Sequence, residues 1–143
     1  MNPVKSPVVK KTLLVLILIT SLFTLSAYAQ KKGIITINTR YTGVQDGYDH
    51  INKTMVYVDG KLAGETSEQV QSKPNSCSIS VERGTHDIRI VNMANYEGNW
   101  EEHTLINEYS IDALYADEIK LKKELTIDIV FDITKEKTFV KLK

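Results

Sequence analysis

The stretch of residues 124–134 restricts the fold of this chain more than any other. Apolar side chains stand at every second position, namely Leu125, Ile127, Ile129, Phe131 and Ile133. The positions between them are mainly polar, so an extended strand here has one apolar and one polar face, whereas a helix would scatter the same side chains around its surface. The stretch therefore predicts a long antiparallel strand that covers a hydrophobic core with one face.

The same period of two recurs in shorter segments, which Gly, Asn, Asp and charged turn residues separate. Strands are expected at residues 34–39, 54–59, 62–66, 76–82, 86–91, 100–107, 124–134 and 138–142. Seven or eight short strands with such regular turns predict an all-β fold, an antiparallel β-sandwich, with an open barrel as the alternative. Asp59-Gly60 is the strongest hairpin signal, because this pair tolerates the positive φ of a tight turn.

Three segments lack a clear strand pattern. Residues 40–53 predict a long loop rich in turn formers, and residues 92–99 also predict a loop. Residues 108–123 are ambiguous, since some of their apolar residues fit the spacing of a helix while Ile119 and Leu121 fit a strand. Irregular structure with one helical turn is expected there.

The N-terminus has the pattern of an export signal. Three lysines precede the apolar run 13–25, and Ala27-Tyr28-Ala29 fits the small-residue rule for cleavage after Ala29. Residues 1–29 are therefore predicted to be a signal peptide, and residues 30–143 a single periplasmic or extracellular domain. An uncleaved anchor is the alternative, although the run is shorter than the ~20 apolar residues that span a bilayer.

The charge balance argues against nucleic acid as a partner. Without the leader, which holds three lysines and no acidic residue, 15 basic residues face 18 acidic ones, a formal charge of −3. Nucleic-acid binders and peripheral binders of anionic membranes carry basic patches instead. We expect no membrane span in the mature domain.

Cys77 is the only cysteine, so the chain cannot form an internal disulfide. A secreted domain without disulfides depends on its hydrophobic core. Cys77 alternates with Ile79 and Val81, which predicts a small buried thiol on the apolar face of a strand. An intermolecular disulfide or a reactive thiol is the alternative.

Two motifs carry a family resemblance. Residues 56–66 read as a strand, the Asp59-Gly60 turn and a Gly-x-Thr return, and Gly84-Thr85-His86 opens a second alternating strand that ends near Asn95-Tyr96. Over residues 34–96 this order resembles PEGA-type domains. The resemblance implies a small extracytoplasmic β-sandwich module of envelope or surface proteins, which binds or supports other components without catalytic residues.

The chain departs from that family pattern at three places. The loop 40–53 replaces a Pro-Gly-Ala segment, and Ser67 stands where the return strand should have a proline. Residues 97–143 add strands that the short module lacks.

No constellation of residues predicts catalysis or a metal site. Neighbouring carboxylates, such as Glu101 and Glu102, point to opposite faces of a strand and so make no acid–base pair. His50, His86 and His103 are too far apart in sequence for the close spacing of zinc ligands. The resemblance to PEGA-type domains implies that His86 forms local hydrogen bonds at the exit of its turn. We expect no enzyme activity, no metal and no cofactor.

One segment has the composition of a recognition surface. Tyr96 and Trp100 flank a glycine-containing turn, and Asn99 offers an amide beside them. Aromatic rings suit stacking on sugars and anchoring of protein partners, although both rings could instead cap the core. The sequence thus predicts a non-catalytic binding module for a protein or glycan of the cell envelope. A structural subunit that associates through an exposed edge strand, such as residues 138–142, is the alternative.

Overall fold

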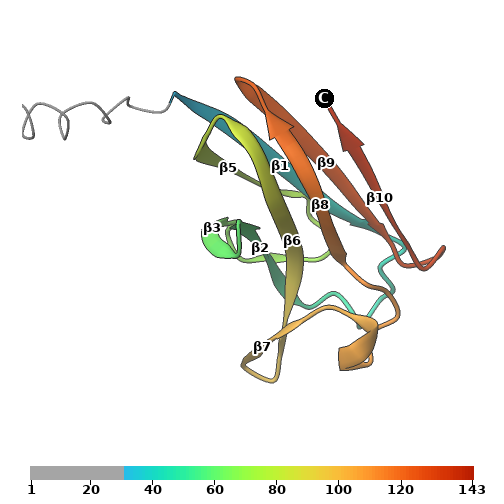
Figure 1. Cartoon of the computed structure of the whole chain (residues 1–143). Helices are drawn as coiled ribbons and strands as arrows, with labels where there is room; N and C mark the ends of the chain where they lie inside the picture. Colours follow the sequence, from blue (N-terminus) through green and yellow to red (C-terminus); the bar gives the residue numbers. More distant parts are fainter. Residues whose placement is uncertain (1–30) are drawn as a thin grey trace, which may run out of the picture. The chain divides into compact units, whose positions relative to one another are not determined.

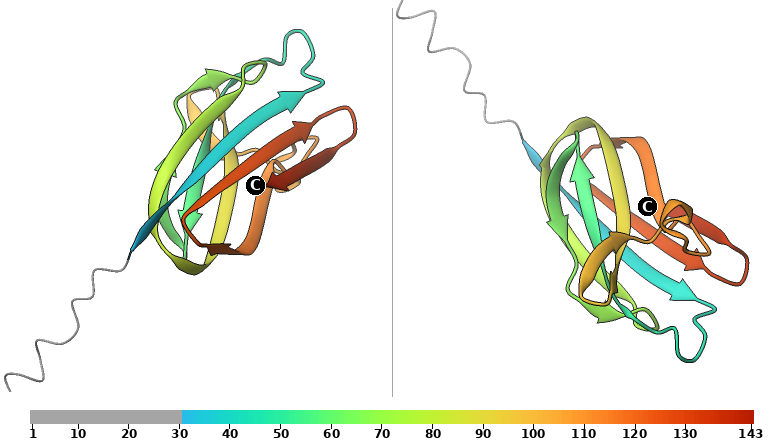
Figure 2. Two further views of the ribbon diagram at one scale, coloured as in Figure 1. Left: turned by 90° about the horizontal axis from the view of Figure 1, so that it is seen from above. Right: turned by 90° about the horizontal axis from the view of Figure 1, so that it is seen from below.

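The computed structural model describes residues 31–143, which form ten strands in two sheets and one 3₁₀ turn, η1 (Leu105–Asn107) (Figure 1). The sheets pack face to face, as two opposite views show (Figure 2). The expected β-sandwich is confirmed, with ten strands in place of seven or eight. The predicted leader, residues 1–29, lies outside the described residues. Within residues 31–143, no helix has the length and apolar character needed to cross a membrane.

The first sheet has the strand order β10-β9-β1-β5. Its strands are β1 (Lys32–Thr42), β5 (Asn75–Glu82), β9 (Glu124–Asp132) and β10 (Lys137–Leu142). The expected antiparallel pairing of β9 holds only toward β10, because β9 runs parallel to β1. Parallel neighbours need a long crossover, and here the chain passes through the second sheet between β1 and β9.

The second sheet is built around β6 (Gly84–Tyr96), its longest strand. On one side lies β2 (Ile51–Val58), which also pairs with β3 (Lys61–Glu65) and β4 (Gln69–Val70). The other edge is shared by β8 (Leu114–Leu121) and β7 (Asn99–Glu102). Residues 103–113 leave the sheet between these two strands and cover one end of the sandwich.

The core lies between the inner faces of the two sheets. Alternation places Ile127, Ile129 and Phe131 of β9 in it, as residues 124–134 predicted. The other buried apolar members are mostly Ile and Val, namely Ile35, Ile37, Tyr41, Val56, Val58, Ile79, Ile88, Ile90, Ile111, Ala113, Ile119 and Leu121. Each such side chain contributes about 1.5–3 kcal/mol by leaving water, which accounts for a stable domain without a disulfide.

The Asp59-Gly60 turn forms the predicted hairpin between β2 and β3. Both residues have positive φ, 50° and 75°, as a tight primed turn requires. The Asp59 carboxylate accepts a hydrogen bond from the Asp87 backbone N–H at 3.0 Å and lies 2.7 Å from His86 Nδ1. His86 Nε2 lies 2.7 Å from the Glu82 carbonyl oxygen, so the expected local role of His86 is confirmed.

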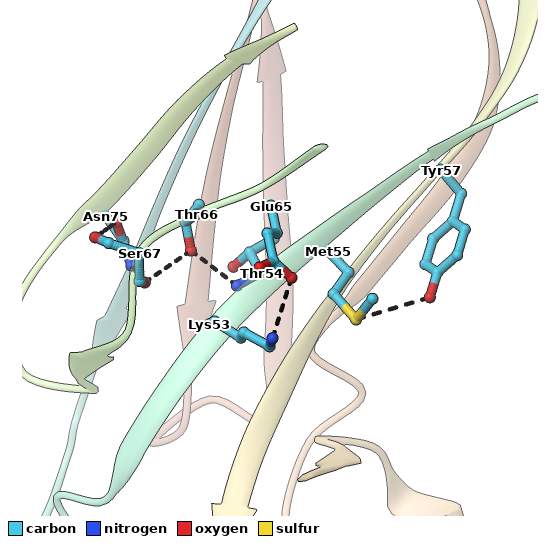
Figure 3. A network of polar contacts seen from close by, with 8 residues as sticks. All are labelled: Lys53, Thr54, Met55, Tyr57, Glu65, Thr66, Ser67 and Asn75. Atoms are coloured by element: carbon cyan, nitrogen blue, oxygen red, sulfur yellow. Dashed lines mark hydrogen bonds and ion pairs between the residues drawn. The ribbon is translucent and has the colours of Figure 1, made fainter. Parts of the chain in front are cut away.

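A polar network closes the return of β3 onto β2 (Figure 3). The Thr54 backbone N–H donates to Thr66 Oγ1 at 2.9 Å, and the Lys53 ammonium pairs with Glu65 at 3.0 Å. Gly64 lies against the opposite sheet, where a Cβ would come within 2.5 Å of Ile79 Cγ2. The sheets approach closely there because glycine has no side chain.

Three expected segments differ from the structure. The loop 40–53 shortens to residues 43–50, since β1 and β2 extend into it. The loop 92–99 is largely strand, because β6 continues to Tyr96. The strand expected at 100–107 ends at Glu102, where the excursion over the end of the sandwich begins.

The prediction of irregular structure with a helical turn at residues 108–123 is wrong for most of that segment. Residues 114–121 form β8, in which Ile119 and Leu121 enter the core at a spacing of two. The free edge of β6 supplies backbone partners for this strand, and sequence spacing could not reveal that edge.

Candidate functional site

A pocket of about 440 Å³ opens at one end of the sandwich. Three segments meet there: the loop 43–50, the end of β6, and the segment 103–113 with η1 (Figure 1). Its aromatic lining consists of Tyr48, His50, Tyr96, His103 and Tyr109. The volume is within the range of roughly 300–1,000 Å³ that is typical of small-molecule sites.

Three of the five rings that line the pocket, those of His50, His103 and Tyr109, form a cluster around His103. His103 stacks on Tyr109 with 4.1 Å between ring centroids, and Tyr41 contacts His103 from the core side at 5.3 Å. The His50 ring lies 6.0 Å from that of His103 and 6.1 Å from that of Tyr109. Mutual contact restrains these three side chains, whereas Tyr48 and Tyr96 stand exposed at the pocket.

Both histidines of the pocket are neutral near pH 7. Burial, and to a smaller extent the neighbouring His50, lowers the pKa of His103 to about 4. The Gln71 amide nitrogen lies 3.2 Å from His103 Nδ1. An amide nitrogen can only donate, so Nδ1 accepts and the ring proton is on Nε2. Burial also lowers the pKa of His50, whose Nε2 is buried with no hydrogen-bond partner among residues 31–143.

A layer of buried polar side chains supports the floor of the pocket. The Tyr41 hydroxyl donates to Asn92 Oδ1 at 2.8 Å, and the Asn92 amide donates to Asn52 Oδ1 at 2.8 Å. The same amide nitrogen lies 3.2 Å from Thr54 Oγ1. Buried polar groups are tolerated when they are satisfied in this way, and such networks hold strands in a fixed register.

Carboxylates stand at the mouth of the pocket. Glu108 lines it, and with Glu101 it also lines an adjoining hollow of about 490 Å³ that shares Tyr96 and Tyr109. The Tyr109 hydroxyl donates to Glu101 Oε1 at 2.7 Å. Burial raises the pKa of Tyr109, and Glu101 raises it further, so the hydroxyl keeps its proton. Among the described residues, no lysine or arginine lines either hollow.

The structure brings together two of the three residues predicted as a site. Strand register pairs Tyr96 with Asn99 and Asn95 with Trp100, so Tyr96 and Asn99 share one face of the β6–β7 hairpin and Trp100 lies on the other. Tyr96 is 60% exposed and lines the pocket. Trp100 is half-buried on the other face, where the Lys53 ammonium lies 5.0 Å from the centre of its ring.

Sequence reasoning missed most of the pocket. His50 lies in the loop 43–50, whereas His103 and Tyr109 lie in the segment 103–113, and only the fold brings the two segments together. The histidines are not spaced as zinc ligands are, so the sequence predicts no site at His50 or His103. Within residues 31–143, no three His, Cys, Asp or Glu side chains cluster so that they could hold a metal ion.

A larger and more open hollow, of about 630 Å³, lies over the outer face of the first sheet. Strand backbones of β1, β9 and β10 line most of it, with Phe139 as its single aromatic side chain. Polar side chains such as Asn38, Arg40 and Asp128 also line it, but it has no group of aromatic rings, so the smaller pocket is the stronger candidate site.

Comparison with known proteins gives no family for this chain. No family model matches it, and no curated protein matches it. Similar solved structures include one described as a Gram-negative toxin (11% identity, TM-score 0.37), the sugar-binding protein pneumolysin (12%, 0.39) and listeriolysin O (14%, 0.32). Each match covers 80% of this chain but only 23%, 24% and 22% of the respective toxin. These scores are too low for any conclusion about this chain.

Proposed function

We propose that this chain is an exported, non-catalytic binding module that recognises a glycan of the cell envelope. The observation that carries the proposal is the aromatic pocket at one end of the sandwich. The resemblance to PEGA-type domains belongs to the same proposal, since such modules bind or support envelope components. The β-sandwich is compatible with it.

The chemistry of the pocket favours a glycan over a protein partner. Tyr48 and Tyr96 are 69% and 60% exposed, so their faces are open to a ligand. Sugar rings have an apolar face that stacks on an aromatic ring and hydroxyls that need polar partners. Gln45, Glu108 and Ser110 line the same pocket and offer such partners. A pocket with an aromatic wall and few polar groups is the usual form of a small-ligand site.

A glycan array followed by calorimetric titration of the hits tests this proposal. We expect Tyr96→Ala and Tyr48→Ala to weaken binding about tenfold or more, since stacking on one ring is worth about 0.5–1.5 kcal/mol beyond the area it buries. Trp100→Ala, on the opposite face of the hairpin, is the matched control and should bind normally. If the tyrosine variants bind as tightly as the wild type, or only Trp100→Ala loses binding, the pocket is not the site.

A second candidate function is assembly through β10. This strand ends the first sheet, and its Phe139, Val140 and Leu142 are between a third and a half exposed. An edge strand of this kind can pair with a strand of another subunit through backbone hydrogen bonds. Analytical ultracentrifugation should then show self-association or a complex that Leu142→Lys disrupts. A monomer at all concentrations, with no partner that β10 captures, would leave only the first proposal.

A further inference from the structure

We propose that the pocket recognises the protonated amine of an amino sugar, held between tyrosine faces and the Glu108 carboxylate. This inference rests on the proposed function and specifies the ligand class for the same site. A neutral glycan needs only stacking and hydrogen bonds. The lining of this pocket also presents a negative electrostatic potential, which favours a cation.

The aromatic wall itself is attractive to a cation. The faces of tyrosine rings carry negative potential, and a cation within about 6 Å of a ring centre is attracted to it, more strongly when it is desolvated. Tyr48, Tyr96 and Tyr109 all line the pocket. The Tyr109 hydroxyl donates to a carboxylate, which makes this ring richer in electron density.

The charged side chains at the mouth of the pocket are negative, like the potential of the tyrosine faces. Glu108 lines both hollows, and Glu101 lies beside it on β7. Glu108 has positive φ (65°) at the end of η1, where its backbone N–H donates to the Leu105 carbonyl. In the part of the chain that the structure describes, no lysine or arginine of the lining neutralises these carboxylates.

The two histidines do not oppose a bound ammonium group. Burial lowers the pKa of each imidazole, so both are neutral near pH 7. Near neutral pH they therefore present uncharged ring surfaces rather than positive charge. His50 lines the pocket, while its Nε2 is buried and has no hydrogen-bond partner among residues 31–143.

A pair of oligosaccharides isolates the role of the amine. The tetrasaccharide of glucosamine and the tetrasaccharide of N-acetylglucosamine share ring and linkage and differ in carrying ammonium or acetamide groups. Calorimetric titration at pH 6 and low salt should show at least tenfold tighter binding of the glucosamine tetrasaccharide. Added NaCl should weaken that binding, since exposed charges are screened.

Two carboxylate variants show whether the effect comes from the pocket. Glu108→Gln keeps the shape of the side chain and should abolish most of the preference for glucosamine while leaving the N-acetylated sugar unaffected. Glu124→Gln is the matched control, because this exposed glutamate on β9 lines neither hollow. Its preference should equal that of the wild type. Circular dichroism establishes that both variants are folded.

The outcomes distinguish this inference from the proposed function. Equal or tighter binding of the N-acetylated sugar overturns the amine inference but leaves a glycan-binding module. A preference for glucosamine that Glu108→Gln leaves intact also overturns it, because the charge would then act elsewhere. Binding of neither sugar overturns it as well, and the glycan array then decides the proposed function separately.

Discussion

His103 makes the folded domain sensitive to acid, and the structure gives the size of the effect. Its ring is almost fully buried between Tyr41, Tyr109 and Gln71, and burial lowers its pKa from 6.5 to about 4. The unfolded chain therefore binds a proton at this position between about pH 6.5 and pH 4, where the folded chain does not. Stability falls as pH decreases through this window.

Linkage gives the magnitude for this single site. A shift from 6.5 to about 4 removes about 2 kcal/mol of unfolding free energy between about pH 8 and pH 5. His103→Phe keeps a ring that packs on Tyr109 but cannot be protonated. It leaves the Gln71 amide without its acceptor, which costs about 1–3 kcal/mol at every pH. The variant should therefore be less stable at pH 8 but lose less stability on acidification.

Urea denaturation followed by circular dichroism from pH 8 to pH 5 measures this difference. His86→Gln is a control that should change the pH dependence of stability in the opposite direction. The hydrogen bond that His86 donates to the Asp59 carboxylate raises the pKa of His86, so its stabilising contribution is full at acid pH and is lost as pH rises through the folded pKa. Its removal should steepen the acid loss. Parallel curves for the wild type and His103→Phe would refute the assignment of a buried neutral imidazole.

Three further outcomes test the packing. Gly64→Ala should destabilise the domain by about 1–3 kcal/mol in urea denaturation, because its Cβ would lie 2.5 Å from Ile79 Cγ2; unchanged stability would contradict the close approach of the sheets. Tyr41→Phe should cost about 1–3 kcal/mol in the same assay, since Asn92 Oδ1 loses its buried donor; a neutral effect would mean that water replaces the hydroxyl. Burial raises the pKa of the half-buried Cys77 thiol. Iodoacetamide at pH 7.5 should therefore alkylate it slowly in the native protein and rapidly in urea; equal rates would show an accessible thiol.

The parts of the fold that depend on local pattern could be predicted from the sequence. The alternation in residues 124–134 places Ile127, Ile129 and Phe131 in the core, and Asp59-Gly60 forms the expected hairpin. These features follow from the two-residue period of a strand and from the φ preference of glycine, which act within a few residues.

Features that depend on distant partners could not be predicted. Asparagine is common in loops, yet β6 continues through Asn92. Its side chain is hydrogen-bonded to Tyr41 and Asn52, which belong to other strands. β8 exists because β6 offers it a free edge. Tyr96 was among the expected binding residues and does line the pocket, whereas register places Trp100 on the opposite face.

The aromatic pocket is the proposed ligand site of this domain. NMR titration of the wild-type protein with the tetrasaccharide of glucosamine, observed through the aromatic side-chain resonances, tests it most directly. If the sugar binds in the pocket, chemical-shift changes should concentrate on His50, His103 and Tyr109 and reach Tyr48 and Tyr96, while the resonances of Trp100 stay unchanged. Shifts confined to Trp100 and its neighbours, or an unchanged spectrum at millimolar sugar, would contradict it.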